Sequence, residues 1–583
     1  MSTAVPVTPS TPSRGPSRLS RRSRRLVTGL AAVAAGVCTG LAFPPTGWWP
    51  LLPLGLAVFG WLTAIRRPRG RMGLALGFLF GLGFFAVLIR WLLVVEVWFA
   101  YFALTAVMAL WLALLGGALT WLGRFRGWPA FAASAWIVVE FADSRWPLGG
   151  FPWGRLAYAA AGTPIDGWFP VISASGVSWL IAATSFLLPW AAAALVQERR
   201  AGRLSLRQLF ADDPAPAPAP PGVGGVAPVP LPEIIQDAVK PLRLLSLAAR
   251  PVAAWVLLTL TAMGGWMGDQ YQPAATDQTV TVGIIQGNVP GTGLDAIGPA
   301  RTTTRNSLAE TIALMARVET GELPRPDFIL WPETSVDMDA EADAETGRLV
   351  AAASDVAQAP ILVGGLTRLP EEGHRYTVAA WWSEDNVVTS RYYKKNIVPF
   401  GEYVPGRAFW QKLFPVLELV GLQTIPGSGP GVVLGALDDG RTIPVGVLIC
   451  FEVGYDATAD QMILGDATLP GAQLVTVQTN NSALTGTGQM EQQDAITRIR
   501  AMEARRDILV ATTNSLADWI GPDGVHRWTA EPEHSAATSV TVPLRTNVTF
   551  AVAHRRAIEV TLVAVPALFL GLGLLRRRAR MAP

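Results

Sequence analysis

The sequence predicts a polytopic α-helical membrane bundle of about eight spans that carries one large α/β domain outside the membrane. Three observations lead to this fold class. Half of the 583 residues are hydrophobic and only 16% are charged, whereas roughly a quarter are charged in an ordinary soluble domain. Eight apolar segments approach or reach the length that spans a bilayer. Between the last two lies a polar stretch, 279–545, in which buried-type strands alternate with helical segments.

The first apolar segment, 26–43, allows several interpretations. It could be a signal peptide, a twin-arginine signal that SRRSRRL matches poorly, or a first membrane helix. A lipoprotein cleavage site at Cys38 is a further interpretation, although Val37 stands where such a site needs a small residue. The apolar segments that follow favour a membrane helix. They lie at 50–65, 72–92, 99–122, 128–142, 168–196, 251–268 and 557–575, and 128–142 is the weakest because it is short and ends at Glu140.

Clustered arginines predict the orientation of the bundle, because Lys and Arg collect in short cytoplasmic loops. Clusters precede the first span, fill the second, fourth and sixth connections and close the chain, so eight crossings put them all on one side. His554, Arg555 and Arg556, before the last span, favour the opposite orientation, but the four arginines of the tail outweigh them. We therefore expect a disordered basic cytoplasmic arm at 1–25, a membrane domain at 26–268 with a cytoplasmic linker at about 197–250 that contains the Pro-Ala run 214–220, an external domain at 279–545, an eighth span at 557–575 and a basic cytoplasmic tail at 576–583.

Composition excludes several classes of function. The formal net charge of +3 is far too small for a general nucleic-acid binder. Two cysteines, Cys38 and Cys450, cannot build a disulfide framework, and the four histidines show no zinc-binding spacing. We therefore expect no nucleic-acid partner and no metal.

The polar stretch predicts a layered sandwich of sheets and helices. It contains continuous apolar runs of the kind found in strands that are buried on both faces. Helical segments lie between these runs. The strands are expected at 280–289, 327–333, 360–368, 443–452 and 473–480, and the clearest helices at 303–319 and 489–506.

Three segments of the polar stretch carry residues that could perform chemistry. Cys450 ends a strand in GVLICFE, although a free cysteine there is most often a small buried hydrophobe. As a nucleophile it would need a base, and no histidine lies in a segment resembling a cysteine-protease partner. Glu333 in WPETS could be that base or an ordinary turn residue. Lys394 and Lys395 in YYKKNIVPFGEYVP are equally good cations on chemistry alone.

The order and spacing of WPE, of YYK before VPFGEYVP, and of LICFE resemble the Glu-Lys-Cys triad of the nitrilase superfamily. Joined to eight spans and to the loop GGFPWGRLAY at 149–158, the chain is similar to the apolipoprotein N-acyltransferase family from about residue 26 to 575. The resemblance implies a nitrilase-like αββα sandwich without a cofactor. It makes Glu333 the general base, Lys394 the stabiliser of the oxyanion and Cys450 the nucleophile. Lys394 is chosen over Lys395 by its register to Ile397.

The same resemblance implies supporting positions, and the chain departs from the family at some of them. Thr377 stands where the family tends to have Asn, the run that begins at Asn481 replaces NDAWFG, and Leu294 replaces a common tryptophan. By resemblance these positions lie on loops around the lipid entrance. The residues expected near the site or in substrate binding are Glu402, Glu452, Thr377, Leu484, Gly150, Phe151, Pro152 and Trp153.

The implied function is acyl transfer from a membrane phospholipid, through a cysteine thioester, to the α-amino group of the N-terminal diacylglyceryl-cysteine of an apolipoprotein. The implied location is the bacterial cytoplasmic (inner) membrane, with the catalytic domain outside, and we expect a monomer. Two alternatives remain open. A membrane-anchored nitrilase-like amidase would not need eight spans, and a non-catalytic lipoprotein-binding membrane protein or transporter is disfavoured because the spans lack the acidic chains of coupled transporters.

Overall fold

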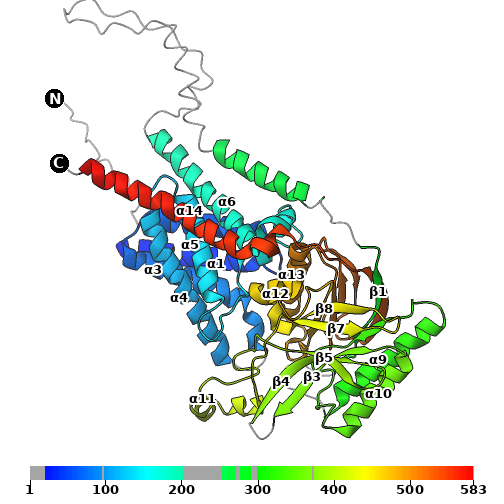
Figure 1. Cartoon of the computed structure of the whole chain (residues 1–583). Helices are drawn as coiled ribbons and strands as arrows, with labels where there is room; N and C mark the ends of the chain where they lie inside the picture. Colours follow the sequence, from blue (N-terminus) through cyan, green and yellow to red (C-terminus); the bar gives the residue numbers. More distant parts are fainter. Residues whose placement is uncertain are drawn as a thin grey trace, which may run out of the picture.

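The protein consists of a helical bundle and an α/β domain that pack side by side (Figure 1). In this computed structural model the described residues are 20–94, 98–200, 252–268, 270, 276–289, 299–369 and 373–581. The Pro-Ala run at 214–220 and Leu294 lie outside them. The bundle is built from the N-terminal part of the chain and from the last helix, so the α/β domain is inserted between two membrane segments.

Among the described residues, each predicted span coincides with an apolar helix. Five of these helices are long and apolar enough to cross a membrane, whereas Leu51–Ile65, α5 and Val252–Gly268 are shorter. Several membrane helices are therefore present, and the count of eight crossings stays a prediction. The helices are α1 (Arg21–Leu41), α2 (Leu51–Gly60, extended to Ile65 by a π-helical segment), α3 (Gly70–Leu88), α4 (Trp98–Leu122), α5 (Trp128–Asp143), α6 (Phe169–Arg200), Val252–Gly268 and α14 (Phe550–Met581).

The packing of the bundle is typical of a membrane protein. Large apolar side chains such as Leu114 of α4 and Phe569 of α14 face outward, where lipid would surround them. Helices α3 and α4 approach closely at glycines, since a Cβ added to Gly77 would lie 2.1 Å from the Leu112 carbonyl oxygen. Small residues at such contacts let the backbones of two helices pack directly.

The predicted disordered arm is too long by several residues. Helix α1 begins at Arg21, and the hydroxyl oxygen of its N-cap Ser20 accepts the Ser23 N–H. The four arginines at 21, 22, 24 and 25 therefore lie on the first turns of α1, because a capped N-terminus continues the helix that the apolar run forms. Helix α14 likewise continues through most of the predicted tail, to Met581.

The α/β domain contains two mixed sheets. Strands in the middle of each sheet run parallel, and the outer strands pair antiparallel except for the short β6, which is parallel to β4. The first sheet has the order β13 (Ala536–Pro543), β1 (Thr279–Gln286), β2 (Phe328–Leu330), β3 (Ile361–Leu369), β4 (His374–Trp382), β5 (Val388–Tyr393), and β6 (Gln423–Thr424) pairs with β4. The second has the order β12 (His526–Thr529), β11 (Asp518–Ile520), β10 (Ile508–Thr512), β9 (Leu474–Thr479), β8 (Thr442–Ile449), β7 (Val432–Ala436).

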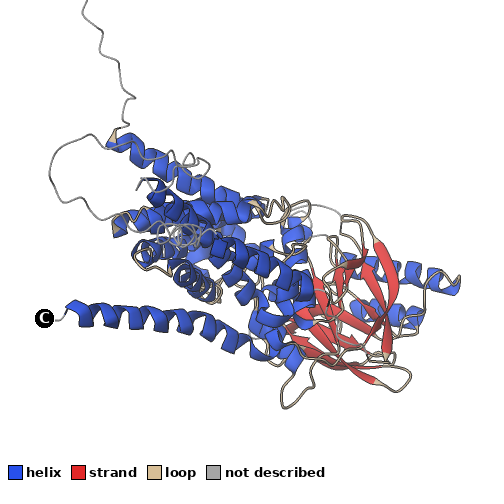
Figure 2. Ribbon diagram, turned by 90° about the horizontal axis from the view of Figure 1, so that it is seen from above, coloured by secondary structure: helices blue, strands red, loops and turns tan. Residues whose placement is uncertain are grey.

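The sheets and helices form an αββα sandwich, as the sequence predicts. One apolar core lies between the sheets and includes Val282 of β1 and Val447 of β8. Helices α9 (Thr302–Glu319) and α10 (Ala344–Ala357) cover the first sheet on the side away from the bundle (Figures 1 and 2). Helices α12 (Asp456–Leu464) and α13 (Gln489–Ala504) cover the second sheet, and their core continues into the bundle. A short helix, α11 (Arg407–Leu413), lies outside these layers.

The five predicted strands are present with small shifts of their bounds. The largest difference is in the run 327–333, of which only Phe328–Leu330 is a strand. Pro332 ends it, since proline cannot donate a hydrogen bond to the sheet. Glu333 therefore stands just beyond a strand end, as Lys394 and Cys450 do after β5 and β8. The fold brings these three ends to one edge of the sandwich.

We predict that the α/β domain and the connection between α2 and α3 lie on opposite sides of the membrane. Thr320 and Arg69 are exposed, and single cysteines can be placed there in a Cys38→Ala, Cys450→Ala background. A membrane-impermeant maleimide should label Thr320→Cys in intact cells and Arg69→Cys only after permeabilisation, because arginine clusters stay in the cytoplasm. Labelling of both positions in intact cells would contradict the predicted topology.

Candidate active site

Cys450 lies at the end of the second sheet, directly after strand β8. The strand is buried from Ile443 to Ile449, and the backbone then turns sharply, with a φ of +52° at Cys450. Such a left-handed conformation is unfavourable for a residue with a side chain and persists only where its surroundings hold it. It turns the half-buried thiol out of the sheet, where its Sγ lies 3.7 Å from Asn481 Oδ1.

A lysine between two carboxylates lies next to the thiol. Lys394 Nζ is 3.0 Å from Glu333 Oε1 and 3.1 Å from Glu402 Oε2, and only 2% of the Lys394 side chain is exposed. The neighbouring Lys395 points away and donates to the Gly429 carbonyl and to Gln461 Oε1. The structure therefore brings Glu333, Lys394 and Cys450 together and places Lys395 elsewhere.

Backbone and hydroxyl groups fix both carboxylates. Glu333 Oε2 accepts the Asn480 N–H at 3.0 Å. Glu402 accepts the Thr377 hydroxyl at 3.2 Å and the Val398 N–H at 2.8 Å. Thr377 and Glu402, both expected near the site, thus lie in the layer that positions the lysine.

The electrostatics of the site keep the thiol protonated. Burial raises the pKa of Cys450 to about 12; the charge of Glu333 raises it as well, and Lys394 opposes both. Burial also raises the pKa of Glu333, against the effect of Lys394. For Lys394, burial acts to lower the pKa, but Glu333 and Glu402 raise it well above its usual value. The arrangement is thus a neutral thiol beside a permanent cation and a carboxylate able to accept a proton.

Asn481 is a site residue that the sequence did not single out for a role. Its amide orientation is fixed, because Nδ2 donates to Gln493 Oε1 at 3.2 Å and Gln493 Nε2 donates to Thr479 Oγ1 at 2.9 Å. Its position just beyond the end of β9 was the available signal. Leu484, expected near the site, lies one turn later, and its N–H donates to the Asn481 carbonyl.

Glu452 supports the turn that carries Cys450. Its carboxylate is fully buried and accepts the Tyr392 hydroxyl at 2.8 Å, the Lys395 N–H at 2.7 Å and the Ile449 N–H at 3.0 Å. These bonds tie the end of β8 to the end of β5. These contacts favour structural hydrogen bonding as the role of Glu452.

The loop 149–158 from the bundle packs directly on the turn Cys450–Gly454. The ring of Phe451 stacks on Trp153 and Phe151, with centroid distances of 5.3 and 6.0 Å. Pro152 lies against Gly454, and the Gly150 carbonyl accepts the Tyr455 hydroxyl. The structure thus places all four loop residues expected from the sequence, Gly150 to Trp153, beside the residues that follow Cys450.

One group of potential metal ligands occurs among the described residues, formed by Asp494, Asp518 and His526. The His526 Nδ1 lies 3.1 Å from Asp518 Oδ1 and its Nε2 lies 3.4 Å from Asp494 Oδ2. Hydrogen bonds to Asp494 and Asp518 raise the pKa of His526 to about 10. A protonated imidazole cannot bind a metal, so we interpret this group as an ion pair.

We predict that Cys450 titrates far above an ordinary thiol. In a Cys38→Ala background, the rate of alkylation should rise about tenfold per pH unit from pH 7 to 10 without a plateau, because thiolate is scarce well below the pKa. Glu333→Gln should lower the pKa, since it removes a negative charge beside the sulfur, and the exposed Glu319→Gln should not. A wild-type plateau near pH 9 would contradict the prediction.

Known proteins match most of the chain. Residues 35–187 match the family model of the apolipoprotein N-acyltransferase N-terminal domain, and residues 296–525 match that of carbon-nitrogen hydrolases. The apolipoprotein N-acyltransferase of Mycolicibacterium smegmatis is 30% identical over 531 residues, which cover 89% of this chain and 82% of that protein. Those of Allorhizobium ampelinum and Gloeobacter violaceus are 27% and 28% identical and cover 85% and 87% of this chain, and 86% of each relative. The chain therefore belongs to the apolipoprotein N-acyltransferase family.

Proposed function

We propose that the protein transfers an acyl chain from a membrane phospholipid, through a thioester on Cys450, to the α-amino group of the N-terminal diacylglyceryl-cysteine of an apolipoprotein. One observation carries this mechanism: the buried Lys394 ammonium, held by Glu333 and Glu402, lies beside a thiol at the junction of the α/β domain and the membrane bundle. A cation, a base and a nucleophile at this junction are the parts that acyl transfer between lipids requires.

The first half-reaction forms the thioester. Glu333 accepts the thiol proton while Cys450 Sγ attacks the ester carbonyl carbon of the phospholipid. Lys394 stabilises the negative charge that develops on the carbonyl oxygen. When the C–O bond of the ester breaks, protonated Glu333 returns the proton to the leaving oxygen, and lysophospholipid departs.

The second half-reaction forms the amide. The α-amino group of the acceptor attacks the thioester carbonyl, and Glu333 accepts the proton that the nitrogen loses. The C–S bond breaks, and the sulfur takes up the proton as Cys450 returns to its resting thiol. Because the pKa of this thiol is high, the sulfur needs the proton at that moment, and Glu333 serves as its donor.

The architecture suits two substrates that are both lipids. Removal of an acyl chain from the membrane would cost about 0.8 kcal/mol for each exposed CH₂. A nucleophile turn that packs on a loop of the membrane bundle avoids this cost, since donor and acceptor stay in the bilayer during transfer. The arginine clusters further support an α/β domain that faces outward. The proposal takes the protein to be a monomer of the bacterial inner membrane.

An amidase with the same triad is the principal alternative. It would use water as the second nucleophile, in place of an amine. The match of residues 35–187 to the N-terminal domain of apolipoprotein N-acyltransferases favours the transferase. Free fatty acid would be the product with water, and N-acylated peptide the product with an amine.

We predict a covalent intermediate on Cys450. Purified protein given phospholipid without an acceptor should gain one acyl mass on the peptide that contains Cys450 and release one equivalent of lysophospholipid. Hydroxylamine at neutral pH should remove the adduct, because it cleaves thioesters. Cys38→Ala should form the same adduct, and turnover in Cys450→Ala would rule out the proposed nucleophile.

We also predict that Glu333 is essential as a base and dispensable for folding. Glu333→Gln keeps the shape of the side chain but cannot accept a proton, so single-turnover acylation should fall by about 10²–10⁴-fold. Glu333→Asp should be impaired as well, since its carboxylate is one methylene further from the thiol. The exposed Glu319→Gln is the matched control. A stable Glu333→Gln variant that acylates at the wild-type rate would remove Glu333 from the mechanism.

A further inference from the structure

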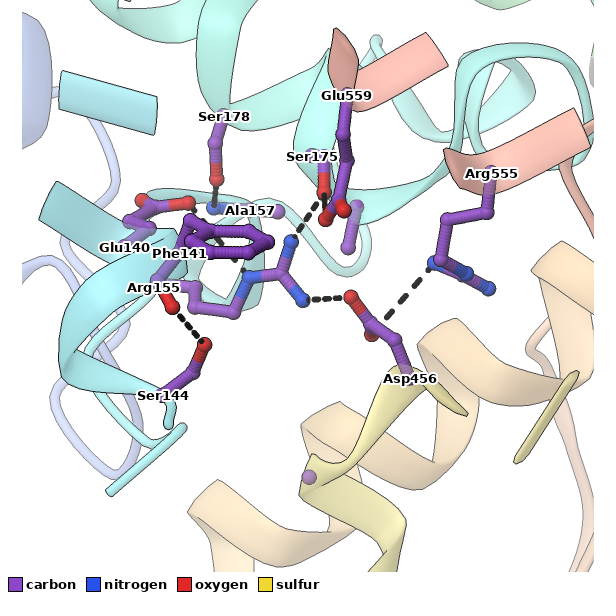
Figure 3. Close-up of polar contacts among 12 residues, drawn as sticks. Glu140, Phe141, Ser144, Arg155, Ala157, Ser175, Ser178, Asp456, Arg555 and Glu559 are labelled. Carbon is purple, nitrogen blue, oxygen red and sulfur yellow. Dashed lines mark hydrogen bonds and ion pairs between the residues drawn. The ribbon is translucent and has the colours of Figure 1, made fainter. Parts of the chain in front are cut away.

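A carboxylate just beyond the nucleophile is surrounded by three arginines. Asp456 is the first residue of α12, six positions after Cys450, and its side chain is only 10% exposed. Its oxygens lie 2.5 Å from Arg155 Nη1, 2.7 Å from Arg500 Nη2 and 3.5 Å from Arg555 Nη1. Figure 3 shows Arg155 and Arg555 directed at this carboxylate. The three arginines lie on the loop before α6, on α13 and on α14. The Asp456 side chain therefore joins these three parts of the protein.

Arg155 is held on its other side by the membrane helices. Its Nη2 donates to Ser175 Oγ of α6 at 2.6 Å, and its Nε lies 3.6 Å from Glu140 Oε2 of α5 (Figure 3). Ser175 in turn donates to Glu559 of α14. A guanidinium group with partners in this fork arrangement has a fixed position and direction. The position of Asp456 is therefore tied to the membrane bundle through Arg155, and Arg555 of α14 provides a second, longer contact.

The segment between Cys450 and Asp456 is held at both ends by the same loop. Trp153 stacks on Phe451, next to the nucleophile, and Arg155 binds Asp456 at the other end. Between them, the Gly454 carbonyl accepts the Tyr158 hydroxyl at 3.2 Å. The positive φ of Cys450 needs such support, since an unfavourable backbone conformation persists only where the surrounding structure determines it.

We propose that Arg155 is a positioning residue for acyl transfer: through its ion pair with Asp456 it holds the nucleophile turn against the membrane bundle and so aligns Cys450 Sγ with the lipid carbonyl. This inference rests on the proposed role of Cys450. Arg155 touches no reacting atom, and its effect passes through the backbone between Asp456 and Cys450. A misplacement of about 1 Å from a distant substitution can cost about 10²-fold in rate.

The test is designed so that folding survives. In Arg155→Gln, Asp456 keeps Arg500 and Arg555, and Glu140 keeps its hydrogen bonds from the Trp136 side chain and the Leu156 N–H. The matched control is Arg145→Gln. Arg145 lies near the same loop, is 38% exposed, and stacks on Phe141.

Single-turnover acylation of Cys450 by phospholipid should be about 10- to 100-fold slower in Arg155→Gln than in the wild type, with an unchanged KM for phospholipid. Arg155→Lys should restore part of the rate, because it keeps the charge but not both contacts. Asp456→Asn should lose at least as much as Arg155→Gln, because it also weakens the pairs with Arg500 and Arg555. The double variant should be no slower than Asp456→Asn, since the contact between the two side chains is already lost. Arg145→Gln should react at the wild-type rate.

A wild-type acylation rate in Arg155→Gln, a loss that appears only as a higher KM, or losses that multiply in the double variant would each overturn the proposal. A lowered thermal midpoint with an unchanged rate below it would reduce Arg155 to a structural anchor and would overturn it too. If Arg155→Gln does not fold, Asp456→Asn takes its place with the same criteria. Turnover by Cys450→Ala in the same assay would instead contradict the proposed function, so the two failures are distinguishable.

Discussion

The site depends on one buried ammonium group between the buried carboxylate of Glu333 and the half-buried carboxylate of Glu402. Removing an ion from water costs several kcal/mol, and the cost is offset only when its partners are close and fully hydrogen-bonded. Lys394 meets this condition through Glu333 and Glu402, which are themselves held by Asn480, Thr377 and Val398. With one cation and two anions, the cluster keeps an excess negative charge. Burial, and in second place this excess charge, keep the adjacent thiol neutral until a proton acceptor acts on it.

One apolar core continues from the α/β domain into the bundle, so the two parts are packed together as well as linked by the chain. Residues of β9 and α13 belong to the same cluster as residues of α3 and of the loop 149–158. Because that loop packs on the turn Cys450–Gly454, the position of the thiol is determined jointly by the α/β domain and the bundle. A domain separated from its bundle would lose the aromatic contacts of Phe451 and two of the three cations around Asp456, Arg155 and Arg555.

The sequence predicts what is local and fails where distant residues pair. Cys450 and Glu333 each follow a buried strand within a short motif, so they could be found. Lys394 could be chosen over Lys395 only from the family resemblance, and in the structure these neighbouring side chains point to opposite sides. Arg155 and Asp456 stand 301 positions apart, and nothing in either segment indicates the other. The start of α1 at Arg21 shows a smaller failure, since basic composition suggested disorder and the Ser20 cap was overlooked.

The pairing of β1 with β13 sets the order in which this protein can mature during synthesis. The two strands form an antiparallel ladder from Thr279↔Pro543 to Gln286↔Ala536, and Thr281 contacts Thr541 across 260 positions of chain. The first sheet is therefore incomplete until the ribosome has made nearly the whole polypeptide, and α14 follows within a few residues. A nascent chain must keep this edge of β1 unpaired from the synthesis of Gln286 until that of Ala536, so closure of the sandwich and insertion of the last helix become nearly simultaneous events.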